Sequence, residues 1–287
     1  MRIAYTSDIH VDLSEGNRAA AAALARAIRA SGPDAVVIAG DAGNTIDAVE
    51  DALSLFESFR GPKLFVPGNH DVWIETSGGV LIDSRTKYTE TIPAACRRMG
   101  FHDLGREPLV IGEVGFVGSL GWYDYSFADP RLGLAEEDYW SGRYGDEIWW
   151  DKKMTYWVSE AAGGAASRER MRDPQVCAEL CERLESDLRW IEARARSIIA
   201  VIHTLPFFVG IARSDPPYYL DAYTGSEGLG RILQAHSKVE LCIHGHKHGS
   251  GEWTIGRIRA LRRTLGRVEE GDDIEERAIG AVGFVEV

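Results

Sequence analysis

Residues 1–44 read MRIAYTSDIHVDLSEGNRAAAAALARAIRASGPDAVVIAGDAGN. Within them, Arg2–Thr6 is a short apolar run, Asn17–Ser31 is rich in alanine with helical spacing of its larger apolar residues, and Ala35–Ala39 is apolar throughout. A strand that is apolar at every position is typical of a sheet covered on both faces. The segment therefore predicts a strand–helix–strand unit of an α/β fold.

The same alternation continues along the chain. Asp47–Phe59 has helical spacing and Lys63–Val66 is a third apolar run, so the opening predicts a parallel sheet with right-handed crossovers. Functional loops of such a sheet lie at the carboxyl ends of its strands. Further elements are predicted as strands at Pro108–Ile111, Val114–Ser119, Ser197–Ile202, Val239–Ile243, Gly251–Ile255 and Ala278–Val287, and as helices at Asp173–Arg196 and Ser226–His236.

Composition excludes several classes of protein. The chain has 287 residues, 45% of them hydrophobic and 26% charged, which argues against disorder of the whole chain. Its formal net charge of −12 disfavours binding to a polyanion, so we do not expect a nucleic acid as a partner. There is no run of about 18 uncharged apolar residues, and we expect no membrane span. With no repeat or evident linker, residues 1–287 are interpreted as one domain.

The N-terminus and the cysteines suggest a cellular location. Polar residues begin at Thr6, which leaves no room for the apolar core of a signal peptide. The four cysteines are scattered and do not have the spacing of a disulfide framework. We therefore expect a reduced, cytoplasmic protein. The oligomeric state cannot be predicted from these features.

Five polar clusters each follow a predicted strand. Six of the eight histidines of the chain lie in these clusters or at these strand ends. Carboxylate, amide and imidazole groups without thiolate suit manganese, iron, zinc, cobalt or nickel. One tetrahedral site needs four ligands, so seven candidates indicate two metal ions that share a bridging ligand. These candidates are Asp8, His10, Asp41, Asn69, His203, His246 and His248.

The motifs D-x-H, G-D-x-x-N, G-N-H-D, a lone H and G-H-x-H occur in this order over residues 8–248. This set of motifs resembles that of the calcineurin-like metallophosphoesterase superfamily. The resemblance implies a four-layer α/β/β/α sandwich of two mixed sheets flanked by helices. It also implies a first metal site of Asp8, His10, Asp41 and His248, and a second of Asp41, Asn69, His203 and His246.

The resemblance also suggests a mechanism. Two dications about 3.5–4 Å apart bridge a water, lower its pKa and direct it in line at phosphorus. His70 would face the substrate, as a general acid for the leaving oxygen or as a charge stabiliser. Asp71, the next residue, is predicted to orient the His70 ring and raise its pKa. Asn44 is interpreted as a turn residue or a partner of the ligands, and not as a ligand itself.

An aromatic-rich stretch, Trp122–Trp157, is the part that least resembles the family. We favour a covering lobe at about 122–175 with its own aromatic core. The alternative is a lid whose rings stack on a planar leaving group, with contacts from Trp122, Tyr123 and Tyr125. Outside the five ligand motifs, His244 is expected to be buried and hydrogen-bonded and not to be a ligand, and His102 and His236 are expected at the surface.

Together these features predict an enzyme. The expected function is hydrolysis of a small phosphate ester by a hydroxide that bridges two divalent transition-metal ions. Manganese is the favoured metal, and a diester is slightly favoured over a monoester because His70 can protonate a poor leaving group. The alternatives are a non-catalytic interaction scaffold with the same fold and a nuclease that acts on nucleic-acid ends.

Overall fold

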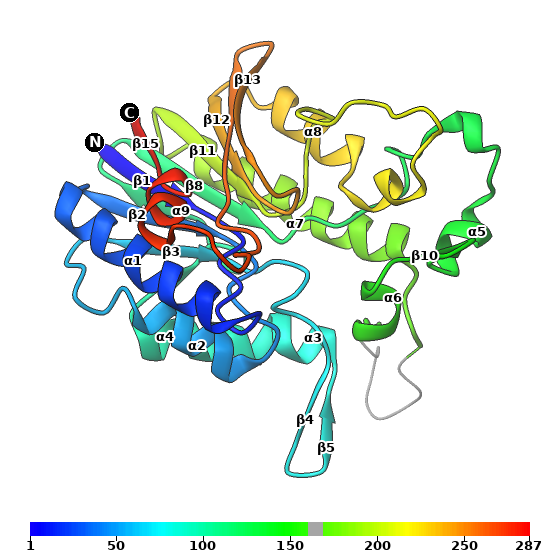
Figure 1. The fold of residues 1–287 in the computed structure, drawn as a ribbon. Coiled ribbons are helices and arrows are strands. Elements are labelled where there is room, and N and C mark those ends of the chain that lie inside the picture. Colours follow the sequence, from blue (N-terminus) through cyan, green and yellow to red (C-terminus); the bar gives the residue numbers. More distant parts are fainter. Residues whose placement is uncertain (160–168) are drawn as a thin grey trace.

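The computed structural model describes residues 1–159 and 169–287, and its main feature is a pair of large mixed sheets (Figure 1). In the first sheet, β15 is antiparallel to β1 and the other neighbours are parallel. The strand order of this sheet is β15 (Gly283–Glu286), β1 (Arg2–Thr6), β2 (Ala35–Ala39), β3 (Lys63–Val66) and β6 (His102–Asp103).

The second sheet has a parallel centre and antiparallel edges. The strands β14, β12, β11 and β8 run parallel, whereas β13 and β7 pair antiparallel with their neighbours. Its order is β13 (Ser250–Ile255), β14 (Ile258–Arg263), β12 (Val239–His244), β11 (Ser197–Ile202), β8 (Val114–Ser119) and β7 (Leu109–Ile111).

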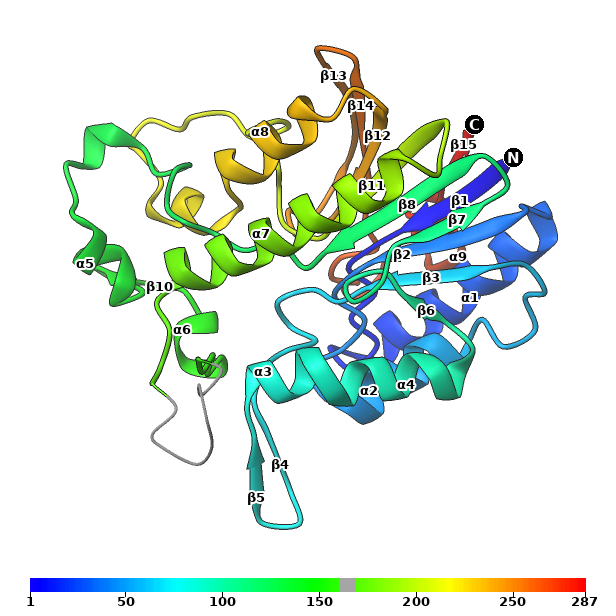
Figure 2. The same cartoon turned by 180° about the vertical axis from the view of Figure 1, so that it is seen from behind.

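Helices cover the outer face of each sheet, which gives the expected four layers (Figures 1 and 2). One helical layer packs on the first sheet and the other on the second. The first consists of α1 (Glu15–Ser31), α2 (Ile46–Ser54), α4 (Ile92–Met99) and α9 (Ile274–Gly280); the second consists of α7 (Asp173–Glu192) and α8 (Glu227–Ala235).

The residues of β2 show why the sheets stack in this way. All five residues from Ala35 to Ala39 are fully buried. Val36 and Ile38 belong to the core beneath the helices, whereas Val37 belongs to the core between the two sheets. Alternating side chains of one strand therefore fill two different cores, as its continuous apolar sequence predicted.

Three predicted elements differ in the structure, and the first is the helix predicted at Asp173–Arg196, which ends at Glu192. The helix predicted at Asp47–Phe59 ends at Ser54, and turns follow it. The strand predicted at Ala278–Val287 is wrong in its first half, because Ala278 lies in α9 and β15 begins only at Gly283. The Asp273 side chain accepts a hydrogen bond from the backbone N–H of Glu276 and so caps α9.

Between β8 and β11 the described part of the aromatic-rich stretch forms a covering lobe. It contains short elements, α5 (Glu136–Trp140), β9 (Arg143–Tyr144), β10 (Glu147–Ile148) and α6 (Asp151–Met154). The rings pack on one another and on Tyr223, and they belong to the same hydrophobic core as the helices of the first sheet, so a separate core for the lobe stays a prediction. Residues 160–168, within the predicted lobe, lie outside the described residues. A further hairpin, β4 (Glu75–Ser77) with β5 (Val80–Ile82), projects from the molecule beside α3 (Ser84–Thr86) (Figure 2).

No helix within the described ranges has both the length and the apolar character needed to cross a bilayer.

Asn17 joins the start of α1 to two loops, and its side chain is fully buried. Its Nδ2 donates to the carbonyls of Ile9 and Gly266, at 3.3 and 2.8 Å, and its Oδ1 accepts from the N–H of Val268 at 3.1 Å. The loop after β1 and the segment after β14 are therefore held together through one amide side chain.

We expect Asn17→Ala to lower the free energy of unfolding by about 2–3 kcal/mol, because it leaves buried backbone groups without partners. Urea unfolding followed by circular dichroism measures this change. The matched control is Ser54→Ala at an exposed position, for which we expect a change within about 0.5 kcal/mol. Equal stability of Asn17→Ala and the control would contradict the role given to Asn17.

Candidate metal centre

The seven predicted ligands come together at the carboxyl ends of five strands. Asp8 and His10 follow β1, Asp41 follows β2, and Asn69 follows β3 of the first sheet. His203 follows β11, while His246 and His248 follow β12 of the second sheet. The two stacked sheets thus supply opposite sides of one site. Hydrogen bonds also cross between the sheets, because the N–H of His246 donates to the carboxylate of Asp8 at 3.1 Å.

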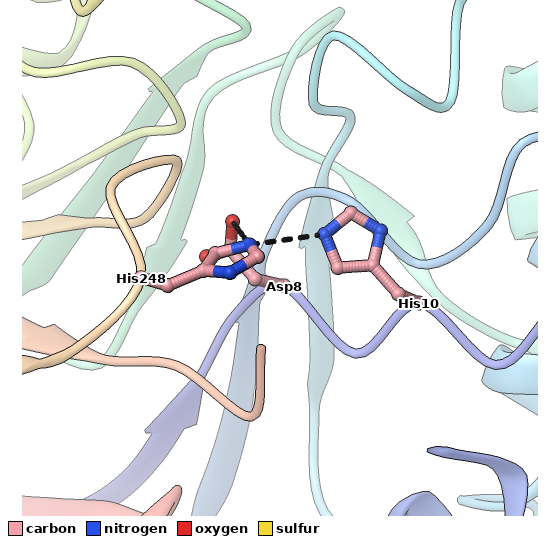
Figure 3. A group of neighbouring side chains, drawn as sticks. All are labelled: Asp8, His10 and His248. Carbon is pink, nitrogen blue, oxygen red and sulfur yellow. Dashed lines mark hydrogen bonds and ion pairs between the residues drawn. The ribbon is translucent and has the colours of Figure 1, made fainter. Parts of the chain in front are cut away.

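The first group of ligand atoms comes from Asp8, His10 and His248, and Figure 3 shows the three side chains facing one another. The Nε2 atoms of His10 and His248 are 3.3 Å apart, and Nε2 of His248 lies 3.6 Å from Oδ1 of Asp8. Oδ2 of Asp41 lies 3.7 Å from Nε2 of His10. These four residues are the predicted first metal site.

The second group is formed by Asp41, His203, His246 and Asn69. Nε2 of His203 lies 3.4 Å from Oδ2 of Asp41 and 3.0 Å from Oδ1 of Asn69. Nδ1 of His246 lies 2.8 Å from the same Asn69 oxygen. Because Oδ2 of Asp41 is close to an imidazole of each group, Asp41 lies where a bridging carboxylate is needed.

The donor set fits two divalent transition-metal ions. Lone pairs of carboxylate, amide and imidazole groups face one another within each group, and such an arrangement is favourable only with a cation or protons between them. Metal-to-ligand distances of about 2.0–2.2 Å place neighbouring ligand atoms roughly 3–4 Å apart, which is the spacing found here. All of the ligands except His246 and His248 are buried.

Hydrogen bonds on the outer side fix two imidazole tautomers. Nδ1 of His203 donates to the carbonyl of Ala39 at 2.8 Å, and Nε2 of His246 donates to the carbonyl of Tyr223 at 3.1 Å. The opposite nitrogen of each ring is therefore free to bind a metal. Desolvation lowers the pKa of His10 and of the partly exposed His246 to about 3, which keeps these two rings neutral. Against the desolvation of its buried ring, Asp41 raises the pKa of His203 to about 9, so this ring must lose a proton when it binds a metal.

The backbone is strained at four of the predicted ligands. The φ angles of Asp8, His10, Asp41 and His246 are +52°, +46°, +55° and +67°, in a region that residues with a Cβ rarely adopt. Such strain is typical of functional sites, where the surrounding structure holds it in place.

A glycine makes the close approach of two ligand loops possible. A Cβ added to Gly68 would lie 2.2 Å from Oδ1 of Asp41 and 2.6 Å from the Asp41 nitrogen. No side chain therefore fits at position 68 without displacing Asp41.

The predicted pairing of Asp71 with His70 is wrong. The buried carboxylate of Asp71 accepts four backbone N–H bonds at 2.7–3.0 Å from two ligand loops, and none of its hydrogen bonds goes to the His70 ring. Instead, Asn44 holds this ring, with Oδ1 2.8 Å from Nδ1 of His70. The Asp71 carboxylate accepts from three N–H groups of the loop after β2 and from that of Gly68 in the loop after β3. Asp71 therefore fixes the loops, and Asn44 orients His70.

His70 lies next to the first group of ligands. Its ring centroid is 4.7 Å from that of His10, and its other face stacks on Trp73 at 4.0 Å. The sequence analysis did not identify Trp73. Its position three residues after His70, within the same turn, was the signal that could have found it.

The predicted substrate contacts of the aromatic lobe also need correction. Trp122 and Tyr123 are fully buried, and Tyr125 is 8% exposed. Nε1 of Trp122 donates to Asp173 at 3.0 Å, and the hydroxyl of Tyr125 also donates to Asp173. All three rings belong to the interior of the lobe, because their polar atoms have partners there.

Two histidines outside the motifs were also considered. His244 is fully buried as expected, but neither ring nitrogen has a hydrogen-bond partner among the described residues. His236 was expected at the surface, yet it is 7% exposed and lies 3.1 and 3.0 Å from carboxylate oxygens of Glu185 and Glu192. These two carboxylates of α7 are the partners of its ring nitrogens.

A four-layer sandwich with two adjoining groups of aspartate and histidine ligands defines a metal-dependent hydrolase. Residues 1–250 match the family model described as calcineurin-like phosphoesterase, and the chain belongs to this family. It is therefore a metal-dependent phosphoric ester hydrolase. No curated protein sequence matches the chain significantly.

Solved structures with the same fold are distant in sequence. The phosphopantetheinyl hydrolase PptH of Mycobacterium tuberculosis superposes with a TM-score of 0.72 at 18% identity, covering 92% of this chain and 89% of that one. TT1561 of Thermus thermophilus has a TM-score of 0.55 at 13% identity, and the match covers 99% of this chain and 97% of that one. A dimetal phosphatase of Danio rerio has a TM-score of 0.53 at 12% identity, and the match covers 91% of this chain and 86% of that one. At these identities the likeness concerns the fold alone.

We expect Gly68→Ala to reduce the affinity for Mn²⁺ by about tenfold or more, because displacing Asp41 disturbs both ligand groups. Isothermal titration calorimetry of metal-free protein measures this affinity. The matched control is Gly280→Ala, where an added Cβ meets nothing within 4 Å. Wild-type affinity in the Gly68→Ala protein would contradict the role of this close approach.

Proposed function

We propose that the chain binds two divalent transition-metal ions, with manganese favoured, and hydrolyses a small phosphate ester. The observation that carries this proposal is the position of Asp41, whose Oδ2 lies within 3.7 Å of His10 in one ligand group and within 3.4 Å of His203 in the other. A complete set of seven ligands favours this enzyme over a scaffold that has lost its metals.

The two ions, when bound, would activate a water and neutralise charge on the phosphoryl oxygens. The chain supplies the acid. Because an amide oxygen only accepts, the bond to Asn44 keeps a proton on Nδ1 of His70 and leaves Nε2 for the substrate. A protonated His70 can then donate from Nε2 to the leaving oxygen. Stacking on Trp73 restricts the ring to this orientation.

A donor for the leaving oxygen supports a preference for diesters over monoesters. The alkoxide that leaves a diester is a poor leaving group, and its expulsion depends on protonation. The proposed preference for diesters depends on His70 alone.

The surroundings of the centre suit a small substrate. A cavity of about 730 Å³ borders the first ligand group at His248, but its wall includes neither His70 nor another proposed ligand, and the support for a small substrate comes from charge. Only Asp8 and Asp41 of the seven ligands carry charge, so two dications would make the centre positive. A positive centre in a chain of net charge −12 attracts a small ester and repels a long polyanion.

We expect His70→Ala to keep both metal ions, since all seven proposed ligands remain. We expect it to lower kcat by about 10²–10³-fold, since it removes the proton donor. Metal content by mass spectrometry and hydrolysis of a phosphate diester with an alkoxide leaving group, whose departure depends on protonation, are measured on the same sample. His102→Ala, at a histidine bonded to the carbonyl of Glu107, is the control and should keep wild-type kcat. Normal turnover in the His70→Ala protein would rule out the proton-donor role.

Removal of metal tests the reaction class. We expect chelator-treated protein to be inactive and Mn²⁺ to restore hydrolysis, because the activated water depends on the ions. A panel of nitrophenyl monoester, nitrophenyl diester, cyclic nucleotides and nucleotides then ranks the substrates by kcat/KM, with the diester expected above the monoester. Hydrolysis that persists without metal, or no hydrolysis of any compound in the panel with Mn²⁺, would contradict the proposal.

A further inference from the structure

Asp151 is a buried carboxylate that no motif of the sequence identifies. It begins α6 in the covering lobe and is 1% exposed. It is not among the predicted ligands, yet its side chain reaches from the lobe to the metal centre. A buried carboxylate is unfavourable unless hydrogen bonds satisfy it, so its partners indicate why it is there.

Both oxygens of Asp151 accept hydrogen bonds. Oδ1 accepts from Nδ2 of Asn69 at 3.0 Å and from Nε1 of Trp73 at 2.7 Å, and Oδ2 accepts from the hydroxyl of Tyr123 at 3.4 Å. Asn69 is a predicted metal ligand, Trp73 stacks on His70, and Tyr123 packs among the aromatic rings of the lobe. One carboxylate therefore connects three parts of the molecule.

The contact with Asn69 selects one orientation of its amide. To bind a metal, Asn69 must turn Oδ1 towards the ligands, where it lies 3.0 Å from His203 and 2.8 Å from His246. Its Nδ2 then needs an acceptor on the other side. An ionised carboxylate only accepts, so a flipped amide would set its oxygen against an oxygen of Asp151. Asp151 thereby disfavours the orientation that cannot bind metal.

The contact with Trp73 acts on His70. The indole N–H is held by the same Oδ1 atom, and the Trp73 ring lies nearly parallel to the His70 ring at 4.0 Å, with 29° between their planes. Trp73 therefore forms a fixed surface against one face of His70, while Asn44 holds its Nδ1. The position of the proton donor thus depends on two hydrogen bonds from different loops.

We propose that Asp151 is a positioning residue that couples the covering lobe to the metal centre, by fixing the amide of Asn69 and, through Trp73, the ring of His70. This inference rests on the metal centre of the proposed function. The lobe would then support metal binding through Asp151 without touching the substrate.

The test compares two substitutions. Asp151→Leu removes both acceptors at similar volume, and we expect one of two Mn²⁺ sites to bind about 10–100-fold more weakly, as when a partner of a metal ligand is lost. Asp151→Asn keeps an amide oxygen for Asn69 and Trp73 and loses only the acceptor of the 3.4 Å bond from Tyr123, whose hydroxyl oxygen still accepts from Trp149. We therefore expect Asp151→Asn to restore Mn²⁺ affinity to within about threefold of wild type.

The control separates metal binding from stability of the lobe. Asp173 is also a buried carboxylate of this region, pairing with Lys152 and bonding to Trp122, but it contacts no predicted ligand. We expect Asp173→Leu to lower Tm and to leave Mn²⁺ affinity unchanged. Titration calorimetry of metal-free protein and thermal melting are measured for each variant.

Catalysis supplies a second readout. We expect Asp151→Leu at saturating Mn²⁺ to lower kcat with little change in KM, because a displaced His70 affects proton transfer and not binding, and Asp151→Asn to recover most of kcat. A purely structural role would lower Tm alike in the Asp151→Leu and Asp173→Leu proteins with no difference in Mn²⁺ affinity, and that result would overturn the inference.

Two outcomes keep the inference distinct from the proposed function. Wild-type protein that binds no Mn²⁺ would overturn the metal centre itself, and the inference with it. A crystal structure of Mn²⁺-loaded wild-type protein decides the matter even where a variant fails to fold. Nδ2 of Asn69 bonded to Asp151 supports the inference, whereas any other acceptor for Nδ2 overturns it alone.

Discussion

The buried carboxylate of Asp71 is the acceptor on which the geometry of the metal centre depends. Its two oxygens gather the backbone N–H groups of Asp41, Ala42, Gly43 and Gly68. These hydrogen bonds fix the turns after β2 and β3 and hold the strained backbone of Asp41, whose carboxylate lies between the two ligand groups. A residue that touches no substrate in the proposed mechanism therefore determines where the reacting groups lie.

The convergence of the seven proposed ligands could be predicted because two independent signals agree on them. Their chemistry suits a transition metal, and each follows a strand of a parallel pattern whose carboxyl ends meet at one edge. This rule acts within each sheet over any separation along the chain, and the stacking of the two sheets then brings Asp8 of one sheet into contact with His246 of the other. The four-layer sandwich was implied by the family resemblance, whereas strands such as Ala35–Ala39, which are apolar on both faces, predict only a sheet that is covered on both sides.

The features that could not be predicted depend on side-chain direction and on contacts between loops. Asp71 is adjacent to His70 in sequence, but the tight turn sends their side chains to different partners, and Asn44 comes from another loop. Trp122 illustrates a second difficulty, because an aromatic ring suits a core as well as a substrate. Only its buried bond to Asp173 distinguishes these roles. In the tail, the cap of α9 lies in an acidic run that has no strong helical pattern.

The four ligands with positive φ have a consequence for how this sequence can change over evolutionary time. Glycine would relieve the strain at Asp8, His10, Asp41 or His246, each costing on the order of 1–3 kcal/mol, but it would also delete a ligand. Selection for stability and selection for turnover therefore act in opposite directions at these four positions. A lineage released from selection for catalysis would be expected to lose its ligands here first and to become more stable as it did so.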